Sequence, residues 1–405
     1  MNSGMKSRPR VAMIVTRSLT EDVSISRVRI LGLICKLFEN NFETSVFRIR
    51  TIIDAKKLKD WSSVCWMAIV GIATFKPIPL QCMLFAASSE IKRLTREISQ
   101  GDFDVVYLDS VRTWGLLRSL RKSRVSVRVV VDFDDLMSRR MEMLSENRWS
   151  LSLGYLQNKL PRVIQKSVDG WLSGVITKYE AWALHRVERE MCKDAQVVVL
   201  VSPAESELLR KQMESLGGAK VCSIVPSRRA VVSKITLRRP YRFVFIGGDV
   251  HGQNRLSLNY LADLWTRCRP DAQLHIYGRQ NLSWPDVHNV FWHGFVNELW
   301  EVYSEDSIAV LPALRAGGIK TKMIEAWAYG RPVLANPTAF EGLDVSGYPL
   351  IVPEAKWGEY IGSPESCEKL WWRAAEIGNE FVRKELSEQR YLDAWREAMW
   401  PKRNF

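Results

Sequence analysis

The amino-acid sequence predicts an α/β fold made of two doubly wound, Rossmann-like domains. Short runs rich in β-branched residues alternate with amphipathic stretches along most of the chain. A basic segment, residues 226–240, interrupts this alternation near the middle. With 405 residues, the chain is also too long for one domain of average size. We therefore expect one domain on each side of the basic segment.

Five apolar runs in the first half predict the strands of one parallel sheet. Each run is almost continuously apolar, which a strand needs when helices cover both faces of its sheet. The runs are Val11–Thr16, Thr44–Ile49, Asp104–Leu108, Val127–Val131 and Gln196–Val201. We expect the N-terminal domain to span residues 1–225.

Five further runs predict a second sheet. Each is followed by a Gly, Pro or Asn signal or by a helical stretch. The runs are Arg242–Ile246, Gln273–Tyr277, Asn289–Trp292, Ser307–Leu311 and Pro332–Ala335. We expect residues 226–240 to form a linker, residues 241–362 to form the C-terminal domain, and residues 363–405 to be helical.

Composition limits the class of partner and the cellular location. Lys and Arg number 58 against 45 Asp and Glu, so the chain carries 13 excess positive charges and favours an anionic partner. Seven widely spaced cysteines without a CxxC pair indicate reduced thiols in a cytosolic protein. The longest uncharged stretch, Trp61–Phe75, is shorter than the roughly 20 residues that span a bilayer. The apolar run near the N-terminus is too short for a secretion signal, so we expect a cytoplasmic protein without transmembrane helices.

The most informative stretch is residues 311–333, where a strand, a glycine loop, a helix and another strand follow one another. Glycines without Cβ let backbone amides approach a phosphate, and the helix N-terminus adds partial positive charge there. Two lysines supply formal charge, and a glutamate on the same helical face can accept the hydroxyl protons of a ribose. These residues are Gly317, Gly318, Lys320, Lys322 and Glu325. An ordinary helix start with solvated lysines is the alternative.

This stretch resembles the donor-site signature of glycosyltransferase family 4, also called group 1, in its bacterial exopolysaccharide and lipid-linked glycan subgroup. The matching positions are Pro312, Gly317, Gly318, Lys322, Glu325, Ala326, Ala328, Gly330, Pro332 and Val333. The resemblance implies the GT-B fold, in which two Rossmann-like domains face each other across a cleft and C-terminal helices cross back to the N-terminal domain. It also implies a nucleotide-diphosphate sugar as substrate, without a cofactor.

The resemblance extends upstream into two further glycine loops. It adds Gly247, Gly248, Asn254 and Gly278 to the expected donor-binding residues. Two departures stand out: Gly317 replaces a glutamate that many members carry, and Asp249 and His251 stand where an Arg and Lys pair is usual.

Two predicted strands of the first half end in acids that are candidates for a general base. A carboxylate can remove the proton of an acceptor hydroxyl as it attacks the sugar. Asp134 is the first choice, followed by Asp132 and Asp109. Helix capping by Asp134 or Asp135 is an equal alternative. Asp132 and Asp134 also resemble a metal-binding DxD pair, but the lysines at the donor helix can neutralise a diphosphate, so we expect no metal.

Basic residues of the first half are candidates for contact with an anionic acceptor or membrane. Residues 15–19 stand where many relatives have a glycine loop after the first strand, and Arg17, Arg27 and Arg29 are candidates for contact with an anionic acceptor; a solvated helix start is the alternative. Residues 138–166 interleave cations with aromatic and leucine side chains, as in helices at anionic membranes. Its candidate contacts are Arg139, Arg140, Arg148 and Trp149. A helix packed on the core is the alternative there.

Together these features predict a metal-independent hexosyltransferase. It moves a sugar from a nucleotide-diphosphate donor to a lipid-linked or polysaccharide acceptor, acting peripherally on the inner face of the cell membrane. A GT-B enzyme resembling nucleotide-sugar epimerases is one alternative, since it uses the same diphosphate site. A nucleic-acid-binding protein is the other, but no zinc-finger, RNP or helix-turn-helix pattern is present.

Overall fold

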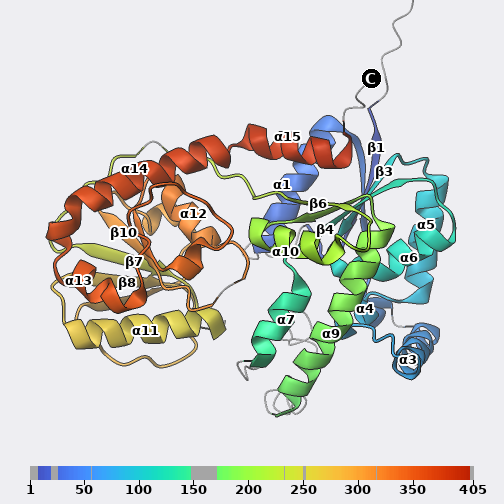
Figure 1. Ribbon diagram of the computed structural model, residues 1–405, viewed down its shortest axis with the longest axis horizontal. Helices are drawn as coiled ribbons and strands as arrows, with labels where there is room; N and C mark the ends of the chain where they lie inside the picture. Colours follow the sequence, from blue (N-terminus) through green and yellow to red (C-terminus); the bar gives the residue numbers. More distant parts are fainter. Residues whose placement is uncertain are drawn as a thin grey trace, which may run out of the picture. The chain divides into compact units, whose positions relative to one another are not determined.

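The computed structural model describes residues 8–19, 26–55, 57–146, 171–231, 233–249, 252–315 and 317–401 (Figure 1). The chain divides into two compact units. Unit 1 comprises Met1–Ile224 with Leu392–Phe405, and unit 2 comprises Val225–Tyr391. Each unit has its own parallel β-sheet, as the alternation of apolar runs predicts.

Unit 1 contains a six-stranded parallel sheet in the order β2-β1-β3-β4-β5-β6. The strands are β1 (Arg10–Val15), β2 (Glu43–Arg48), β3 (Val105–Asp109), β4 (Arg128–Asp134), β5 (Val197–Leu200) and β6 (Lys220–Ser223). The five apolar runs predicted in this half are all strands. Strand β6 was not predicted, because this edge strand is four residues long and starts with an exposed lysine.

Helices on both faces explain why the inner strands are apolar throughout. They are α1 (Ser26–Asn41), α2 (Ile52–Ala55), α3 (Leu58–Ala73), α4 (Leu80–Leu84), α5 (Ser88–Gln100), η1 (Val111–Thr113), α6 (Trp114–Lys122), α7 (Met137–Glu146), α9 (Trp171–Asp194) and α10 (Pro203–Met213). None of the helices in the described part of the chain combines the length and apolar character needed to cross a membrane.

Unit 2 contains a five-stranded parallel sheet in the order β11-β10-β7-β8-β9. The strands, which match the five predicted runs, are β7 (Arg242–Ile246), β8 (Gln273–Tyr277), β9 (Val290–Gly294), β10 (Ser307–Leu311) and β11 (Val333–Ala335). The main helices are α11 (Gly252–Cys268), α12 (Thr321–Ala328), α13 (Trp357–Gly362) and α14 (Glu368–Glu385).

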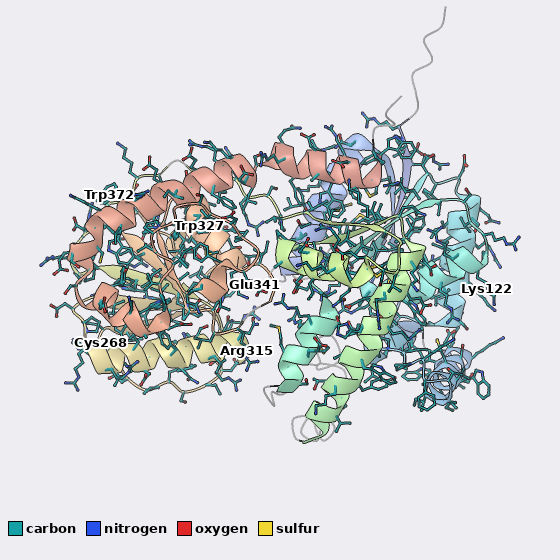
Figure 2. The ribbon with its side chains drawn as sticks, viewed as in Figure 1. Lys122, Cys268, Arg315, Trp327, Glu341 and Trp372 are labelled. Atoms are coloured by element: carbon teal, nitrogen blue, oxygen red, sulfur yellow. The ribbon has the colours of Figure 1, made fainter. Side chains whose placement is uncertain are left out.

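Buried tryptophans dominate the core of unit 2. Trp265, Trp327, Trp357 and Trp371 are fully buried, and Trp327 is labelled in Figure 2. Helix α14 approaches Trp327 at Gly378, where an added Cβ would lie 2.2 Å from the indole. This glycine therefore permits close packing of α14 on α12.

The segment predicted as a linker runs along unit 2 by backbone hydrogen bonds. Val231 N–H donates to Ala328 O at 2.6 Å, and Thr236 N–H donates to Glu305 O at 2.8 Å. The last helix is α15 (Glu388–Met399). From Leu392 onward the chain belongs to unit 1, where Trp395 packs edge-on against Phe38 and Tyr107.

Candidate functional site

In unit 2, the loops that follow β7 and β8 approach each other closely. Gly247 N–H donates to Tyr277 O at 2.7 Å, and an added Cβ on Gly278 would lie 2.5 Å from Gly248 N. A Cβ on Gly247 would lie 2.8 Å from the Lys322 ammonium. The predicted glycines therefore bring backbone at the carboxyl edge of the sheet against the side chain of Lys322.

Lys322 lies in the first turn of α12, beside the loop after β7. Its ammonium donates to Asn254 Oδ1 at 2.6 Å and lies 4.7 Å from the centre of the Phe245 ring. Asn254 in turn donates to Gly248 O at 2.9 Å. Burial lowers the pKa of Lys322 to about 8, although Glu325 acts in the opposite direction. The structure thus brings together four predicted donor residues: Gly247, Gly248, Asn254 and Lys322.

In the glycine loop before α12, a backbone amide donates a hydrogen bond to a carboxylate of the protein. Gly317 has a φ of 100° and Gly318 a φ of 62°, a conformation that favours glycine. Gly317 N–H donates to Glu341 Oε2 at 2.6 Å, and Lys320 Nζ donates to Gly317 O at 2.6 Å. Glu341, labelled in Figure 2, had no predicted role. The amide expected to face a phosphate is therefore held by a carboxylate.

Glu325, the predicted ribose contact, lies one turn into α12. The Arg228 guanidinium lies 3.6 Å from Glu325 Oε1, and both side chains are mostly buried. Arg228 belongs to the segment that was predicted only as a linker. Its place in the site could not be predicted, because nearly a hundred residues separate it from Glu325.

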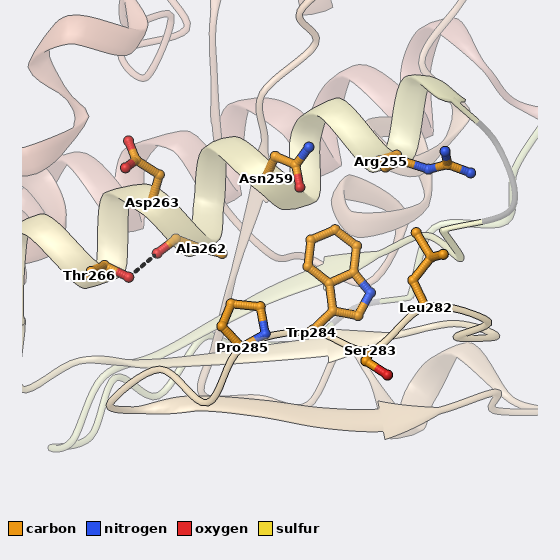
Figure 3. A pocket seen from close by; sticks show the side chains of 9 residues that line it. All are labelled: Arg255, Asn259, Ala262, Asp263, Thr266, Leu282, Ser283, Trp284 and Pro285. Carbon is orange, nitrogen blue, oxygen red and sulfur yellow. Dashed lines mark hydrogen bonds between the residues drawn. The ribbon is translucent and has the colours of Figure 1, made fainter.

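Asp249, one of the departures from the family pattern, has a structural role. It is fully buried and accepts hydrogen bonds from Asn281 N–H, Leu282 N–H and the Trp284 indole. These contacts hold the loop after β8, which together with α11 lines a surface groove of about 380 Å³ (Figure 3). Arg255 and Asp263 from α11 face this groove. Asp249 therefore fixes the conformation of the loop after β8.

In unit 1, the three candidate acids converge on Arg27 in the first turn of α1. Its guanidinium donates to Asp109 Oδ1 at 2.8 Å, to Asp132 Oδ2 at 2.9 Å and to Asp134 Oδ1 at 3.1 Å. The acids end neighbouring strands, so the carboxyl edge of the sheet brings them together. Arg27 is buried, which contradicts the alternative of a solvated helix start.

Asp109 and Asp132 use both carboxylate oxygens within this cluster. The second oxygen of Asp109 accepts from Thr16 N–H and from the Thr16 hydroxyl. Asp132 also accepts from the Tyr107 hydroxyl at 2.6 Å and from the Asp134 N–H at 3.0 Å. Burial raises the pKa of Asp109, but Arg27 and Thr16 outweigh burial and lower it. Both carboxylates are therefore held on both oxygens by hydrogen-bond donors of unit 1.

Asp134 differs from its two neighbours. Its side chain is 31% exposed, its φ is 66°, and within the described residues its Oδ2 receives no hydrogen bond. Burial and repulsion from Asp135, Asp132 and Asp109 raise its pKa, and Arg27 offsets only part of this effect. Of the three acids, Asp134 is therefore the one with an oxygen available to a ligand.

The N-terminus of α7 is capped by acids from elsewhere. Leu136 N–H donates to Glu205 Oε2, and Ser138 N–H donates to Glu188 Oε1, both at 3.0 Å. The described hydrogen bonds do not include a side-chain cap by Asp134 or Asp135. The capping alternative for Asp134 therefore does not match these contacts.

The basic residues predicted to meet an acceptor lie in several environments. Arg17 is partly buried, and repulsion from it adds to burial in lowering the pKa of Arg112, on η1. Arg139 Nη1 lies 3.9 Å from Glu205 Oε1. The side chain of Arg140 is exposed, and its Nη1 lies 3.4 Å from Asp135 Oδ2. Arg148 and Trp149 fall outside the described residues. The described part of the chain contains no group of three or more ligand side chains suited to a metal ion.

Residues 240–360 match the family model of the group 1 glycosyl transferases. No curated protein matches the sequence significantly. Among solved structures, a sucrose-phosphate synthase from Thermosynechococcus elongatus shares 15% identity with a TM-score of 0.62, covering 96% of this chain and 98% of that one. The lipopolysaccharide outer core galactosyltransferase WaaB shares 12% identity with a TM-score of 0.57, again with 96% and 98% coverage.

HepE of Anabaena, solved with UDP and glucose, shares 10% identity with a TM-score of 0.58, covering 96% of this chain and 99% of that one. These likenesses extend over nearly the full length of both chains. Together they show that the protein has the GT-B fold of glycosyltransferases, as the family resemblance implies. The matched segment, residues 240–360, contains the whole glycine-loop and α12 region.

Proposed function

We propose that this protein is a metal-independent hexosyltransferase that uses a nucleotide-diphosphate sugar as donor. The observation that carries the proposal is the convergence of Lys322, Asn254 and Gly247 at the N-terminus of α12, inside the segment that matches group 1 glycosyl transferases. A buried ammonium beside close-approaching backbone suits a diphosphate. HepE, which shares the fold, was solved with UDP-glucose as well as with UDP, which supports a nucleotide sugar as donor.

The donor residues divide into two roles. Lys322, Lys320 and the amides of Gly317 and Gly318 neutralise the diphosphate as it leaves, with the Glu341 carboxylate giving way to phosphate oxygens at Gly317. Glu325, held by Arg228, accepts the ribose hydroxyls. Gly278 and Gly248 keep the adjacent loops close enough for backbone contact with the nucleotide.

In the acid cluster, Asp134 is the proposed general base. Its free oxygen and raised pKa suit removal of a proton from an acceptor hydroxyl. Asp109 and Asp132 act as positioning residues, because both hold Arg27 and thereby the carboxylate of Asp134. Proton abstraction strengthens the hydroxyl as a nucleophile toward the anomeric carbon, while the bond to the diphosphate breaks.

The proposed acceptor is lipid-linked or a polysaccharide, bound at the cytoplasmic surface of the membrane. Arg17 and Arg112 follow strands at the carboxyl edge of the unit 1 sheet, and repulsion from Arg17 adds to burial in lowering the pKa of Arg112. A phosphate of a lipid-linked acceptor suits two such guanidinium groups. Arg139 and Arg140 on α7 add further positive charge.

The test is nucleotide-sugar binding by calorimetry, followed by transfer assays. We expect UDP-glucose or a related nucleotide sugar to bind, and Lys322→Ala and Glu325→Ala each to weaken binding by about 1.5–3 kcal/mol, roughly 10- to 150-fold. Exposed Lys369→Ala and Glu376→Ala on α14 are matched controls and should bind normally. Unchanged affinity in both site variants would exclude this donor site. Conversion of the free nucleotide sugar without transfer would favour the epimerase alternative.

A further inference from the structure

Helix α3 lies at the periphery of unit 1 (Figure 1). Its outward face exposes large apolar side chains. Trp66 is 68% exposed, and Phe75, just beyond the helix, is 83% exposed. The other exposed large apolar side chains of the helix are Leu58, Trp61, Ile69, Val70 and Ile72. A surface helix ordinarily turns polar residues outward, so this face is the reverse of the usual pattern. Soluble monomers rarely leave such a continuous apolar patch uncovered.

The opposite face of α3 packs against the rest of unit 1. The one acidic residue of the helix, Asp60, lies on this buried face. Val64 and Gly71 are buried, and Asp60 is 1% exposed. Asp60 accepts from Ser89 N–H at 2.9 Å and from the hydroxyls of Ser88 and Ser89. It therefore caps α5 and contributes no negative charge to the outward face.

Within residues 57–76, the charged side chains that remain exposed are all positive. Lys57 and Lys59 lie at its N-terminal end, and Lys76 lies just after its C-terminal end. Like charges at both ends, with no acid on the exposed face, oppose pairing with the same face of a second copy. The same lysines complement an anionic surface, where each contributes about 1 kcal/mol. Tryptophan is also enriched at the level of lipid headgroups.

The dimensions of α3 indicate how it can meet a bilayer. Its 16 residues give a helix of about 24 Å, which is shorter than the roughly 30 Å hydrocarbon core. An apolar helix of this length with cationic ends therefore fits the plane of the interface.

We propose that α3 is the membrane-docking element of this protein and inserts its outward face into the cytoplasmic leaflet of an anionic bilayer. The helix lies parallel to the surface, with its apolar side chains at the boundary between headgroups and acyl chains, about 5–10 Å deep. The lysines at its ends contact anionic headgroups. The proposal deepens the proposed function, because it supplies the contact through which a lipid-linked acceptor becomes accessible, but binding to lipid does not require sugar transfer.

Flotation with vesicles of phosphatidylcholine containing 30% phosphatidylglycerol, about a third anionic lipid, tests this proposal on the full-length protein. We expect the wild type to float with these vesicles and Trp66→Glu/Ile69→Glu to reduce the bound fraction at least about tenfold. The control Leu208→Glu/Leu216→Glu changes exposed leucines on and after α10 and should float normally. Pure phosphatidylcholine vesicles should bind more weakly, because the lysines lose their partners. Equal flotation of the wild type and the α3 variant, or no flotation of either, would overturn the proposal.

A fluorophore on Cys65 reports insertion directly, since this exposed thiol lies on the outward face of α3. In a Cys268→Ser background, which removes the other exposed cysteine, an environment-sensitive label on Cys65 should shift to the blue when vesicles are added. An unchanged spectrum would contradict insertion. Loss of a dimer in the Trp66→Glu/Ile69→Glu variant, without vesicle binding by the wild type, would instead identify a second copy as the occupant. UDP affinity measured on the same variants keeps this test separate from the proposed function, because the donor residues lie in unit 2.

Discussion

Arg27 shows how one side chain gives three similar carboxylates different properties. Its single positive charge faces three acids, so it cannot neutralise all of them. The pKa of Asp109 is lowered, whereas that of Asp134 is raised. The sequence pointed to these acids because they end apolar strands. It could not identify Arg27 as their common partner, because 82 to 107 positions separate Arg27 from Asp109 and Asp134.

Substitution of Asp134 by asparagine tests its proposed role as the base. Asp134→Asn keeps the shape of the side chain but cannot accept a proton, so turnover should fall by about 10²- to 10⁴-fold. Donor affinity should be unchanged, because the donor residues lie in unit 2. Steady-state kinetics and calorimetry on the same preparation separate the two effects. In the wild type, turnover should rise with pH as Asp134 loses its proton; near-normal turnover in the variant would remove Asp134 from the mechanism.

The lowered pKa of Lys322 predicts how donor binding depends on pH. In the free protein this lysine loses its proton at about pH 8, whereas a bound diphosphate stabilises the charged form. Affinity for UDP should therefore fall as pH rises above 8, by up to about tenfold per pH unit, with proton uptake on binding. Calorimetry in two buffers of different ionisation enthalpy measures both. Lys322→Arg should bind without this dependence, and a flat wild-type profile from pH 7 to 9.5 would contradict the assignment.

At the scale of elements, the helices of unit 1 are connected by carboxylates that cap helix termini distant in sequence. Glu188 of α9 and Glu205 of α10 accept from the first amides of α7, and Asp60 of α3 does the same for α5. Such caps satisfy amides that a helix start otherwise leaves unpaired. The sequence predicts the helices from their periodicity. It does not predict these caps, because each capping acid comes from another element.

Glu188 gives this capping a measurable pH dependence. Burial raises its pKa from 4.5 to about 7, so folding favours the protonated form between these values. Ionisation of the buried Glu188 carboxylate therefore lowers the free energy of unfolding. This loss of stability grows as pH rises from 4.5 to 7 and is complete above 7. Glu188→Gln resembles the protonated form and can still accept from Ser138. It should stabilise the protein by about 1–3 kcal/mol at pH 8, with a smaller gain at pH 5.

Denaturation in urea at both pH values measures this difference. Glu214→Gln is a suitable control, because Glu214, just after α10, is exposed and makes no hydrogen bond or ion pair among the described contacts. An equal gain at pH 5 and pH 8 would show that the ionisation of Glu188 does not cause the effect.

At the scale of the whole molecule, the pattern of apolar runs predicted both sheets, and the family resemblance predicted their GT-B class. Ten of the eleven strands in the described part of the chain were predicted, because buried parallel strands are apolar throughout. Both units also place their candidate residues at the carboxyl edges of strands, as the fold class predicts. The contacts from the 226–240 segment could not be predicted, because its residues show neither periodicity nor a motif.

Removal of divalent metal tests the mechanism of the complete enzyme. Lys322 and the N-terminus of α12 provide positive charge at the diphosphate, and Asp132 is already committed to Arg27 and Tyr107. Transfer activity should therefore persist in EDTA at its original rate. The assay is repeated after adding Mn²⁺. Activity that disappears in EDTA and returns with manganese would favour the alternative of a metal held by Asp132 and Asp134.

The position of Trp395 affects the order in which the protein is completed during synthesis. This side chain is 1% exposed in unit 1, where it packs on Tyr107, whose hydroxyl holds Asp132. All of unit 2, Val225–Tyr391, is translated between the strands of unit 1 and this residue. At about 5–20 residues per second, the nascent core of unit 1 lacks Trp395 for roughly 10–30 s. Unit 1 therefore begins synthesis first but completes its core last, and the packing of Trp395 on Tyr107 is among the final contacts to form.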